Sequence, residues 1–241
     1  FSLLTISGTN VESPKFSFFL TSIDQLHQDI REFELTPEDI NMINPNTKTT
    51  PIFRTRVDAE LTKKIYKNVP VLINEELGEN PWKVSFKQGL FNMTSDSNLF
   101  HTYPGKHRLP LYEAKMISQY NHRFGSYENY DPSSSSTHLE TPDEEQYKDP
   151  NFTVQPRYWV DKFEVLKKVA DIDEEEFESL DSLEKNNFIK NNLPDWYIGF
   201  RDITNTTNER TSIFSLVPNS GVGNSLPLII SDLFPDEKLS C

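Results

Sequence analysis

The spacing of hydrophobic residues changes along this chain, and that change constrains its fold more than any other feature. Over 55–68 the apolar residues Val57, Leu61 and Ile65 recur at helical spacing. Over 82–86 large apolar and polar residues alternate, which is typical of a strand with one exposed face. Since helical and strand segments neither alternate regularly nor occur alone, the sequence predicts an α+β fold with mixed short strands.

Local signals in the first third predict a hairpin and a short helix. Two apolar runs, 1–6 and 16–20, flank a turn-rich stretch, which indicates a β-hairpin. The phrase Thr-Pro-Glu-Asp at 36–39 combines a helix cap, a proline in the first turn and two acids. We therefore expect a helix that ends near Ile43.

The remaining part of the chain contains signals for a loop, an acidic helix and three strands. The stretch 126–151 is rich in serine, proline and acids and predicts a loop. Residues 171–184 carry eight acids and no base, which fits an acidic helix. Gly-Val-Gly at 221–223 lacks the third glycine of a dinucleotide motif and predicts a turn. Strands are predicted at 196–200, 213–217 and 226–231.

Composition indicates a folded domain in a reducing compartment. Of the 241 residues, 35% are hydrophobic and 12% aromatic, so the chain can bury a sizeable core. The single cysteine, Cys241, excludes an internal disulfide framework and a cysteine-based zinc cluster. We expect a cytoplasmic setting. No apolar stretch reaches the roughly 20 residues that a membrane span needs, so we expect no membrane partner.

The net charge of −13 argues against nucleic-acid binding only if it is evenly spread. Two segments, 140–149 and 171–184, hold 13 of the 37 acids and only one of the 24 bases. Outside them 24 acids face 23 bases, a net charge of −1. The rest of the chain can therefore form local basic surfaces, while the acidic segments face solvent.

The densest group of polar and basic side chains lies at 106–127. If 113–123 is helical, side chains four residues apart share a face. The pattern then predicts an apolar face of Tyr112, Met116 and Tyr120 and a polar face of Lys115, Gln119 and Arg123. Lysine and arginine can hold phosphates, and arginine and glutamine can bridge base edges in the major groove. An ordinary amphipathic surface helix explains the pattern equally well.

Two further groups are candidates for contact with nucleic acid. Arginines stand next to an aromatic or to a second arginine, and such pairs suit stacking on bases or phosphate binding. The polar stretch 201–211, between two predicted strands, can present donors to base edges. Surface residues beside core aromatics, and a turn that satisfies its own backbone, are the alternatives. The candidate DNA-binding residues from these groups are Arg54, Arg56, Arg157, Arg201, Asn205, Asn208 and Arg210.

An enzymatic alternative uses part of the same region. Asp96, Glu113 and Lys115 match the Asp…Glu-x-Lys arrangement of metal-dependent nucleases, in which two carboxylates hold Mg²⁺ and the lysine orients water. A bare Glu-x-Lys occurs by chance in most chains of this length, so the pattern is weak. The five histidines show no metal-ligand spacing.

Longer phrases carry a family resemblance over most of the chain. They are PIFRTRVDAELTKKIY (51–66), LPLYEAKMISQYNHRFGSY (109–127), QPRYWVDK (155–162) and WYIGFRDITNTTNERTSIFSLVPNSGVGNSLPLI (196–229). Together they resemble the C-terminal part of large bacterial adenine-specific DNA methyltransferases of restriction-modification and phage-defence systems. The phrase at 112–115 is similar to a Tyr-x-Gly-Lys element of that family, with Ala114 in place of the usual glycine.

The resemblance implies a division of labour between this chain and residues before it. The catalytic Asn-Pro-Pro-Tyr segment and the S-adenosylmethionine site would precede Phe1, so this chain would hold no cofactor and no catalytic residue. Residues 1–30 would be the last hairpin of the methyltransferase core, 31–70 a helical connector and 71–241 the DNA target-recognition domain. The implied partners are double-stranded DNA and the methyltransferase core of the same chain.

A third hypothesis comes from the acidic segments 140–149 and 171–184. As solvated acidic faces they could bind another protein of a defence complex, which would make the chain a protein-interaction module.

Overall fold

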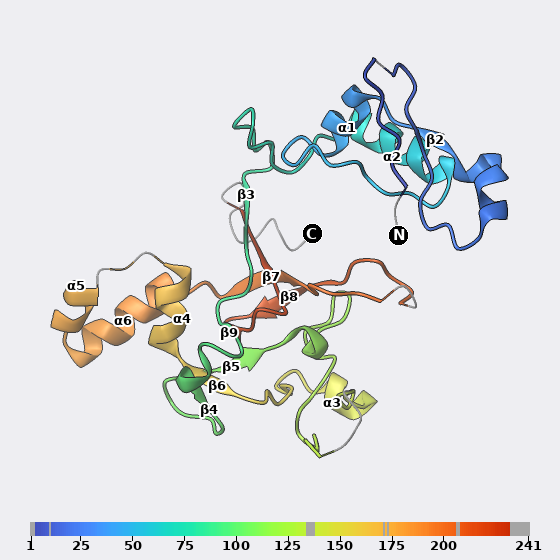
Figure 1. Cartoon of the computed structure of the whole chain (residues 1–241). Coiled ribbons are helices and arrows are strands. Elements are labelled where there is room, and N and C mark those ends of the chain that lie inside the picture. Colours follow the sequence, from blue (N-terminus) through green and yellow to red (C-terminus); the bar gives the residue numbers. More distant parts are fainter. Residues whose placement is uncertain are drawn as a thin grey trace. The chain divides into compact units, whose positions relative to one another are not determined.

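The chain adopts a mixed α+β fold, as the sequence predicts, and divides into two compact units. The computed structural model describes residues 3–9, 11–133, 138–170, 172, 174–205 and 208–231. Unit 1 is Phe1–Val84 and unit 2 is Ser85–Cys241 (Figure 1). In the part of the chain described, no helix combines the length and the apolar character needed to cross a bilayer.

Unit 1 contains two capped α-helices at the predicted positions. Helix α1 (Pro37–Ile43) begins after Thr36, whose hydroxyl accepts a hydrogen bond from the backbone N–H of Asp39. Helix α2 (Arg56–Asn68) begins after Thr55 in the same way. In both, the acid at the third position accepts a bond from the backbone of the cap, so each helix has a complete capping box. Both predicted helices are confirmed.

The hairpin predicted at the start of unit 1 is wrong. Strand β1 (Lys15–Phe16) pairs instead with β2 (Phe33–Glu34), in an antiparallel arrangement that sets Phe16 opposite Phe33. Two 3-10 helices, η1 (Ile23–His27) and η2 (Asp29–Arg31), lie between the strands. The residues 3–6 form no strand and Leu3 is 98% exposed. Pairing with β2 lets Phe16 stack on the buried ring of Phe33, a contact that 3–6 do not make.

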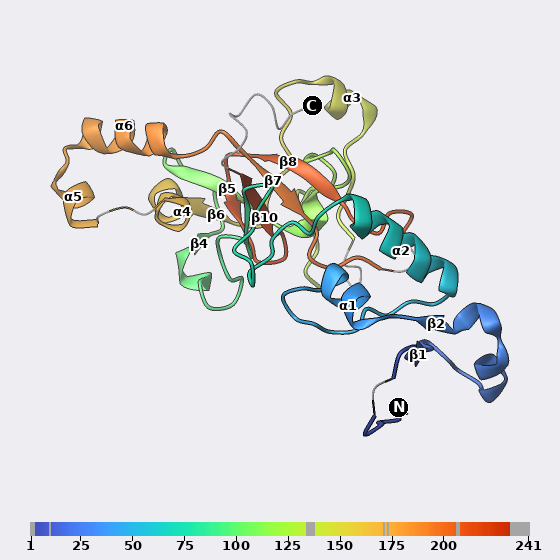
Figure 2. The ribbon, with the colours of Figure 1, turned by 90° about the horizontal axis from the view of Figure 1, so that it is seen from above.

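Unit 2 contains two four-stranded sheets (Figure 2). The first has the order β3-β10-β7-β8, and its strands are β3 (Val84–Lys87), β10 (Leu228–Ser231), β7 (Trp196–Phe200) and β8 (Phe214–Pro218). The second has the order β4-β6-β5-β9, and its strands are β4 (Phe100–His101), β6 (Trp159–Asp161), β5 (Arg108–Tyr112) and β9 (Gly221–Val222). The three strands predicted in the C-terminal part are confirmed as β7, β8 and β10.

The glycine-rich segment 221–223, predicted as a turn, is instead part of the core. Strand β9 runs parallel to β5, with Leu111 opposite Gly221. Gly221 is buried, and a Cβ on it would collide with a methyl group of Val160 on β6. The glycine therefore leaves room for the Val160 side chain against the backbone of β9 within the second sheet, which a motif search for turns does not reveal.

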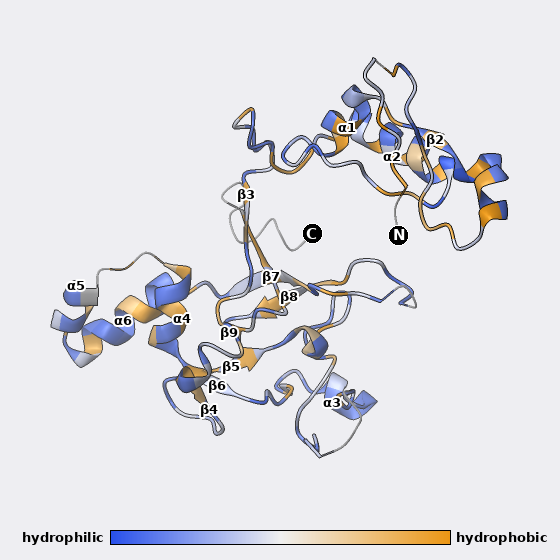
Figure 3. Cartoon of the chain, in the orientation of Figure 1, coloured by the Kyte–Doolittle hydropathy of each residue, from blue (hydrophilic) through white to orange (hydrophobic). Residues whose placement is uncertain are grey.

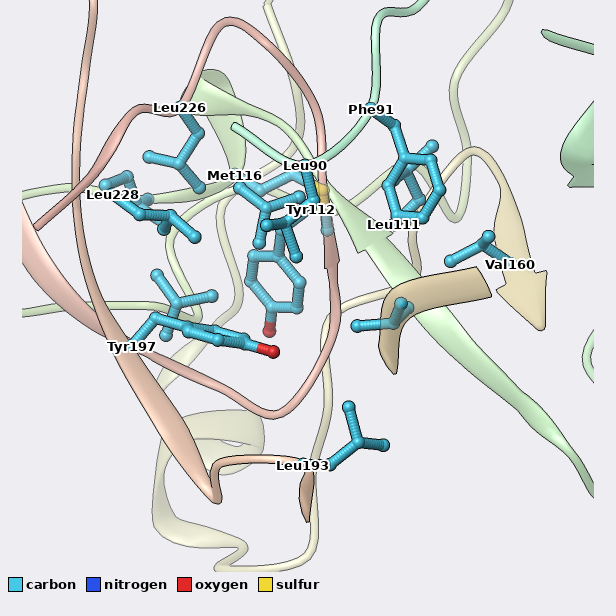
Figure 4. Close-up of a cluster of buried hydrophobic side chains, with 14 of the residues drawn as sticks. Leu90, Phe91, Leu111, Tyr112, Met116, Val160, Leu193, Tyr197, Leu226 and Leu228 are labelled. Atoms are coloured by element: carbon cyan, nitrogen blue, oxygen red, sulfur yellow. The ribbon is translucent and has the colours of Figure 1, made fainter. Parts of the chain in front are cut away.

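A continuous apolar core supports both sheets (Figure 4). Leu111, Met116 and Val160 are fully buried, and they are joined by Leu228 of β10 and by Leu226, which precedes that strand. The core therefore contains side chains from both sheets and holds the segments of the candidate site in place.

Helical segments complete the described part of unit 2, and three of them correct the sequence-based predictions. The expected loop at 126–151 contains a short hydrophilic helix, α3 (Glu144–Lys148), capped by Asp143 (Figure 3). The expected acidic helix is split in two because Asp181 caps a new helix and so ends the previous one. The two parts are α5 (Glu174–Ser179) and α6 (Ser182–Asn192). The other helical segments are η3 (Ser97–Leu99), η4 (Ala114–Met116) and α4 (Lys162–Val169).

Candidate functional site

The segment 113–123 forms a loop that folds back on itself, and the prediction of a helix there is wrong. Only η4 is helical, after which the Met116 carbonyl accepts hydrogen bonds from the N–H groups of Phe124 and Gly125. A Cβ on Gly125 would lie 2.6 Å from the Lys115 carbonyl oxygen, so the glycine permits this close return. The expected faces are therefore not formed: Met116 is fully buried, whereas Tyr120 is 86% exposed.

Two of the predicted DNA-binding side chains in this loop have partners within the fold. The Arg123 guanidinium donates to the carbonyls of Asp149, Tyr147 and Phe152 over 3.0, 3.2 and 3.4 Å. The side-chain carbonyl of Gln119 accepts a hydrogen bond from the backbone N–H of Phe214, at 2.9 Å. Both side chains hold chain segments together, and a role in reading bases would require them to leave these bonds.

Two further arginines are engaged in the same manner. Arg201 donates from Nε to the carbonyl of Ile117 over 3.1 Å and from Nη2 to the same oxygen. Burial lowers the pKa of the Arg201 guanidinium. In unit 1, Arg56 donates to the carbonyls of Glu32 and Asp29, over 3.0 and 2.9 Å. Guanidinium donors that are already bonded to carbonyls have less capacity left for phosphate.

Lys115 and Arg157 are brought together around one ring. The Lys115 ammonium lies 5.5 Å from the ring centre of Tyr130 and 5.1 Å from that of Tyr127. The Arg157 guanidinium lies 6.0 Å from the Tyr130 ring and 5.1 Å from that of Tyr158. The rings of Tyr127 and Tyr130 meet edge to face at 5.1 Å. Two predicted site residues, 42 positions apart in the sequence, therefore share a cluster of tyrosines.

Three of these side chains, Tyr127, Tyr130 and Arg157, line a cavity of about 490 Å³, which we call the aromatic cleft, and Lys115 lies against two of the lining rings. That volume lies within the ordinary range of small-ligand pockets. Three aromatic rings and two prolines provide flat apolar surfaces, and an amide, a hydroxyl, a carboxylate and a guanidinium provide polar groups. The lining residues are Thr102, Tyr127, Glu128, Tyr130, Pro132, Gln155, Pro156, Arg157 and Trp159.

The two cations beside the Tyr130 ring are not neutralised by salt bridges in the part of the chain that the structure describes. Among the described residues, neither Lys115 nor Arg157 has a carboxylate within ion-pair distance. Lys115 is half-buried, so solvent screens its charge less than that of a fully exposed lysine. Glu128 is the acidic residue in the lining. The cleft can therefore take an anionic group beside a flat ring.

A partly buried hydrogen bond holds one of the tyrosines that line the cleft. The Tyr127 hydroxyl donates to a carboxylate oxygen of Glu113 over 2.8 Å. Burial, together with the charge of Glu113, raises the pKa of Tyr127 above its ordinary range. The phenol therefore keeps its proton and remains a donor to Glu113.

The nuclease arrangement gains no support from this geometry. The Glu113 carboxylate accepts from Tyr127, whereas Asp96 accepts from the backbone N–H of Asn92 over 2.8 Å and faces Lys168 at 3.9 Å. Across the residues that the structure describes, no three or more His, Cys, Asp or Glu side chains gather as metal ligands.

The remaining predicted residues lie elsewhere on the surface. Asn205, Asn208 and Arg210 are exposed in the connection between β7 and β8, and the N–H of Asn208 donates to the carbonyl of Asn205 over 2.9 Å. Arg54 is exposed in unit 1 and lies 4.7 Å from the ring centre of Phe19.

Sequence reasoning did not identify Tyr127 and Tyr130 as site residues. Their only signal was a pair of tyrosines three positions apart, shortly after Gly125, inside a segment expected to be a loop.

Comparisons of this chain with protein-family models, with curated protein sequences and with solved structures found no match.

Proposed function

We propose that this chain is the DNA-binding specificity region of an adenine-specific DNA methyltransferase and that its aromatic cleft contacts nucleic acid. The observation that carries the proposal is that Lys115 and Arg157, which have no carboxylate partner among the described residues, both lie against the ring of Tyr130 at a cleft lined by aromatic side chains. In this proposal the methyl transfer and the S-adenosylmethionine site belong to a methyltransferase core of the same protein, as the resemblance implies.

The physical basis is that nucleic acids offer both groups that the cleft can hold. Phosphates are attracted by lysine and arginine, and bases stack on aromatic rings with about 1–3 kcal/mol for each base. The edge-to-face contact of Tyr127 and Tyr130 holds both rings in fixed orientations, which reduces the entropy lost on stacking.

The distribution of charge also favours contact on this side of unit 2. The acidic segments contain α3, α5 and the first turn of α6, and none of their described residues lines the cleft. Their 13 acids would repel a phosphate backbone, so DNA is expected to avoid them.

Fluorescence anisotropy with a labelled DNA duplex of mixed sequence, at a series of salt concentrations, tests the proposal. Replacing both cations, Lys115→Ala with Arg157→Ala, should weaken binding and reduce the slope of log K against log salt by about 2. The matched control removes two exposed lysines of the acidic helices, Lys148→Ala with Lys190→Ala, and should leave that slope unchanged. The absence of salt-sensitive binding by the unmodified chain, or equal effects of the two double variants, would contradict the proposal.

A further inference from the structure

Tyr120 combines an unfavourable backbone conformation with an exposed ring. Its φ angle is +59°, in the left-handed region that residues with a Cβ rarely adopt, and its side chain is 86% exposed. No burial of the ring compensates for that conformation. Strained residues of this kind persist only where their surroundings enforce them, and they concentrate at functional positions.

The turn around Tyr120 is fixed by backbone hydrogen bonds. Ser118 and Asn121 bond to each other in both directions, over 2.8 and 3.0 Å. The N–H of Tyr120 donates over 2.8 Å to the carbonyl of Phe214, the first residue of β8, whose own N–H donates to the side chain of Gln119. The turn is thereby attached to the end of a sheet strand.

Three polar side chains brace the same turn from within unit 2. Arg201 holds the carbonyl of Ile117, and Asn121 bonds both to the N–H of Arg123, over 2.8 Å, and to the hydroxyl of Tyr147, over 3.1 Å. The Arg123 guanidinium in turn holds the segment 147–152. The arginines that the sequence suggested as DNA contacts therefore support the loop that presents Tyr120.

The connection between β7 and β8 is anchored to this turn near both of its ends. Arg201, just after β7, bonds to Ile117, and Phe214 at the start of β8 bonds to Gln119 and Tyr120. This connection carries the exposed side chains of Asn205, Asn208 and Arg210. Asparagine and arginine can pair with adenine and guanine edges, respectively. The two ends of the connection are thus held by the turn that presents Tyr120.

We propose that Tyr120 is a base-stacking residue, whose ring lies against a nucleobase that has left the duplex stack. The inference rests on the proposed DNA-binding function. It names a residue that would contact a base and not the phosphate backbone. A planar ring on a fixed turn loses little entropy when it stacks, because its backbone is already ordered. The backbone strain is retained because tyrosine supplies the ring that glycine, the residue best suited to this conformation, would lack.

Three single variants separate the ring from the backbone. Tyr120→Gly and Tyr120→Asn relieve the left-handed conformation and remove the ring, whereas Tyr120→Phe keeps both the ring and the strain. The full chain would be tested for urea unfolding and for binding to duplexes containing the fluorescent base 2-aminopurine at successive positions.

We expect Tyr120→Gly to unfold at the same or a higher urea concentration than the unmodified chain, yet to bind DNA about tenfold more weakly. It should also lose the change in 2-aminopurine fluorescence at one position. Tyr120→Asn should weaken binding similarly, and Tyr120→Phe should retain binding. A tyrosine with a merely structural role would instead lower stability when replaced and leave the fluorescence change intact.

The failures of the two proposals are distinguishable. Salt-sensitive DNA binding that is equal in the unmodified chain and in Tyr120→Gly would overturn the stacking role and leave the DNA-binding function standing. No DNA binding by the unmodified chain would overturn both. If Tyr120→Gly loses binding to anionic lipid vesicles but not to DNA, the ring belongs to a membrane contact and the stacking role is wrong.

Discussion

The two units differ in how much of their apolar surface they bury. Unit 1 has a small core of Phe33, Leu35 and Ala59. On α2, the apolar side chains of Val57, Leu61 and Ile65 are each at least 50% exposed. Unit 2 has a continuous core that connects two sheets. Burial of apolar area is the main stabilising contribution to folding. Unit 2 therefore gains most of its stability from its own core, whereas unit 1 depends on a few aromatic contacts.

The largest expected difference is between the loss of a leucine side chain in unit 2 and the loss of one in unit 1. Leu111→Ala in β5 removes a fully buried side chain and should lower the free energy of unfolding of unit 2 by about 2–5 kcal/mol. Leu61→Ala on α2, where the side chain is 56% exposed, should change stability by no more than about 0.5 kcal/mol. Urea unfolding followed by the fluorescence of Trp159 and Trp196 measures the first and circular dichroism the second. Equal losses would mean that the α2 stripe is covered and that the contrast is wrong.

How well each feature could be predicted depends on how far apart in the sequence the residues that determine it lie. Helices α1 and α2 were predictable because Thr36 and Thr55 cap them through residues three positions away. Strands β7 and β8 were predictable from alternation within five residues. In unit 1 the hairpin prediction failed because the aromatic partner of Phe16 is Phe33, beyond two intervening 3-10 helices.

The candidate site was less predictable for the same reason. The loop at 113–123 is helical in pattern, but Arg201 and Phe214, 84 and 95 positions from their partners, provide the hydrogen bonds that fold it back. Lys115 was predicted on the polar face of a helix, and Arg157 was predicted separately as a cation beside aromatics. Their meeting at Tyr130 depends on the placement of 126–132 beside β6, which no local pattern encodes.

A smaller effect contrasts two arginines. Arg201→Met leaves the Ile117 carbonyl in unit 2 without its donor and should cost about 1–3 kcal/mol of unfolding free energy. Arg54→Met in unit 1 removes an exposed cation beside Phe19 and should cost at most about 0.5 kcal/mol. Differential scanning calorimetry of both variants provides the comparison. A cost for Arg54→Met as large as that for Arg201→Met would show that unit 1 relies on its polar surface as much as unit 2 relies on its interior.

The smallest expected effect depends on pH and uses the tyrosines that unit 2 buries. Burial raises the pKa of Tyr112 to about 12, although the charge of Arg123 partly opposes this. The free tyrosine pKa is about 10, so the stabilisation is fully present below pH 10. Above that value the unfolded chain loses the proton first. The stabilisation therefore falls between pH 10 and 12, as the pH approaches the folded-state pKa.

Tyr112→Phe should remove this part of the pH dependence. Between about pH 9 and about pH 11, the unmodified chain should lose about 1.4 kcal/mol more of its unfolding free energy than Tyr112→Phe loses. Urea unfolding monitored by tryptophan fluorescence at the two pH values measures the difference, and comparison within each protein cancels any packing cost of the lost hydroxyl. Identical alkaline losses in both proteins would show that Tyr112 ionises as readily in the folded chain as in the unfolded one, and the buried core of unit 2 would then be more open to solvent than its packing indicates.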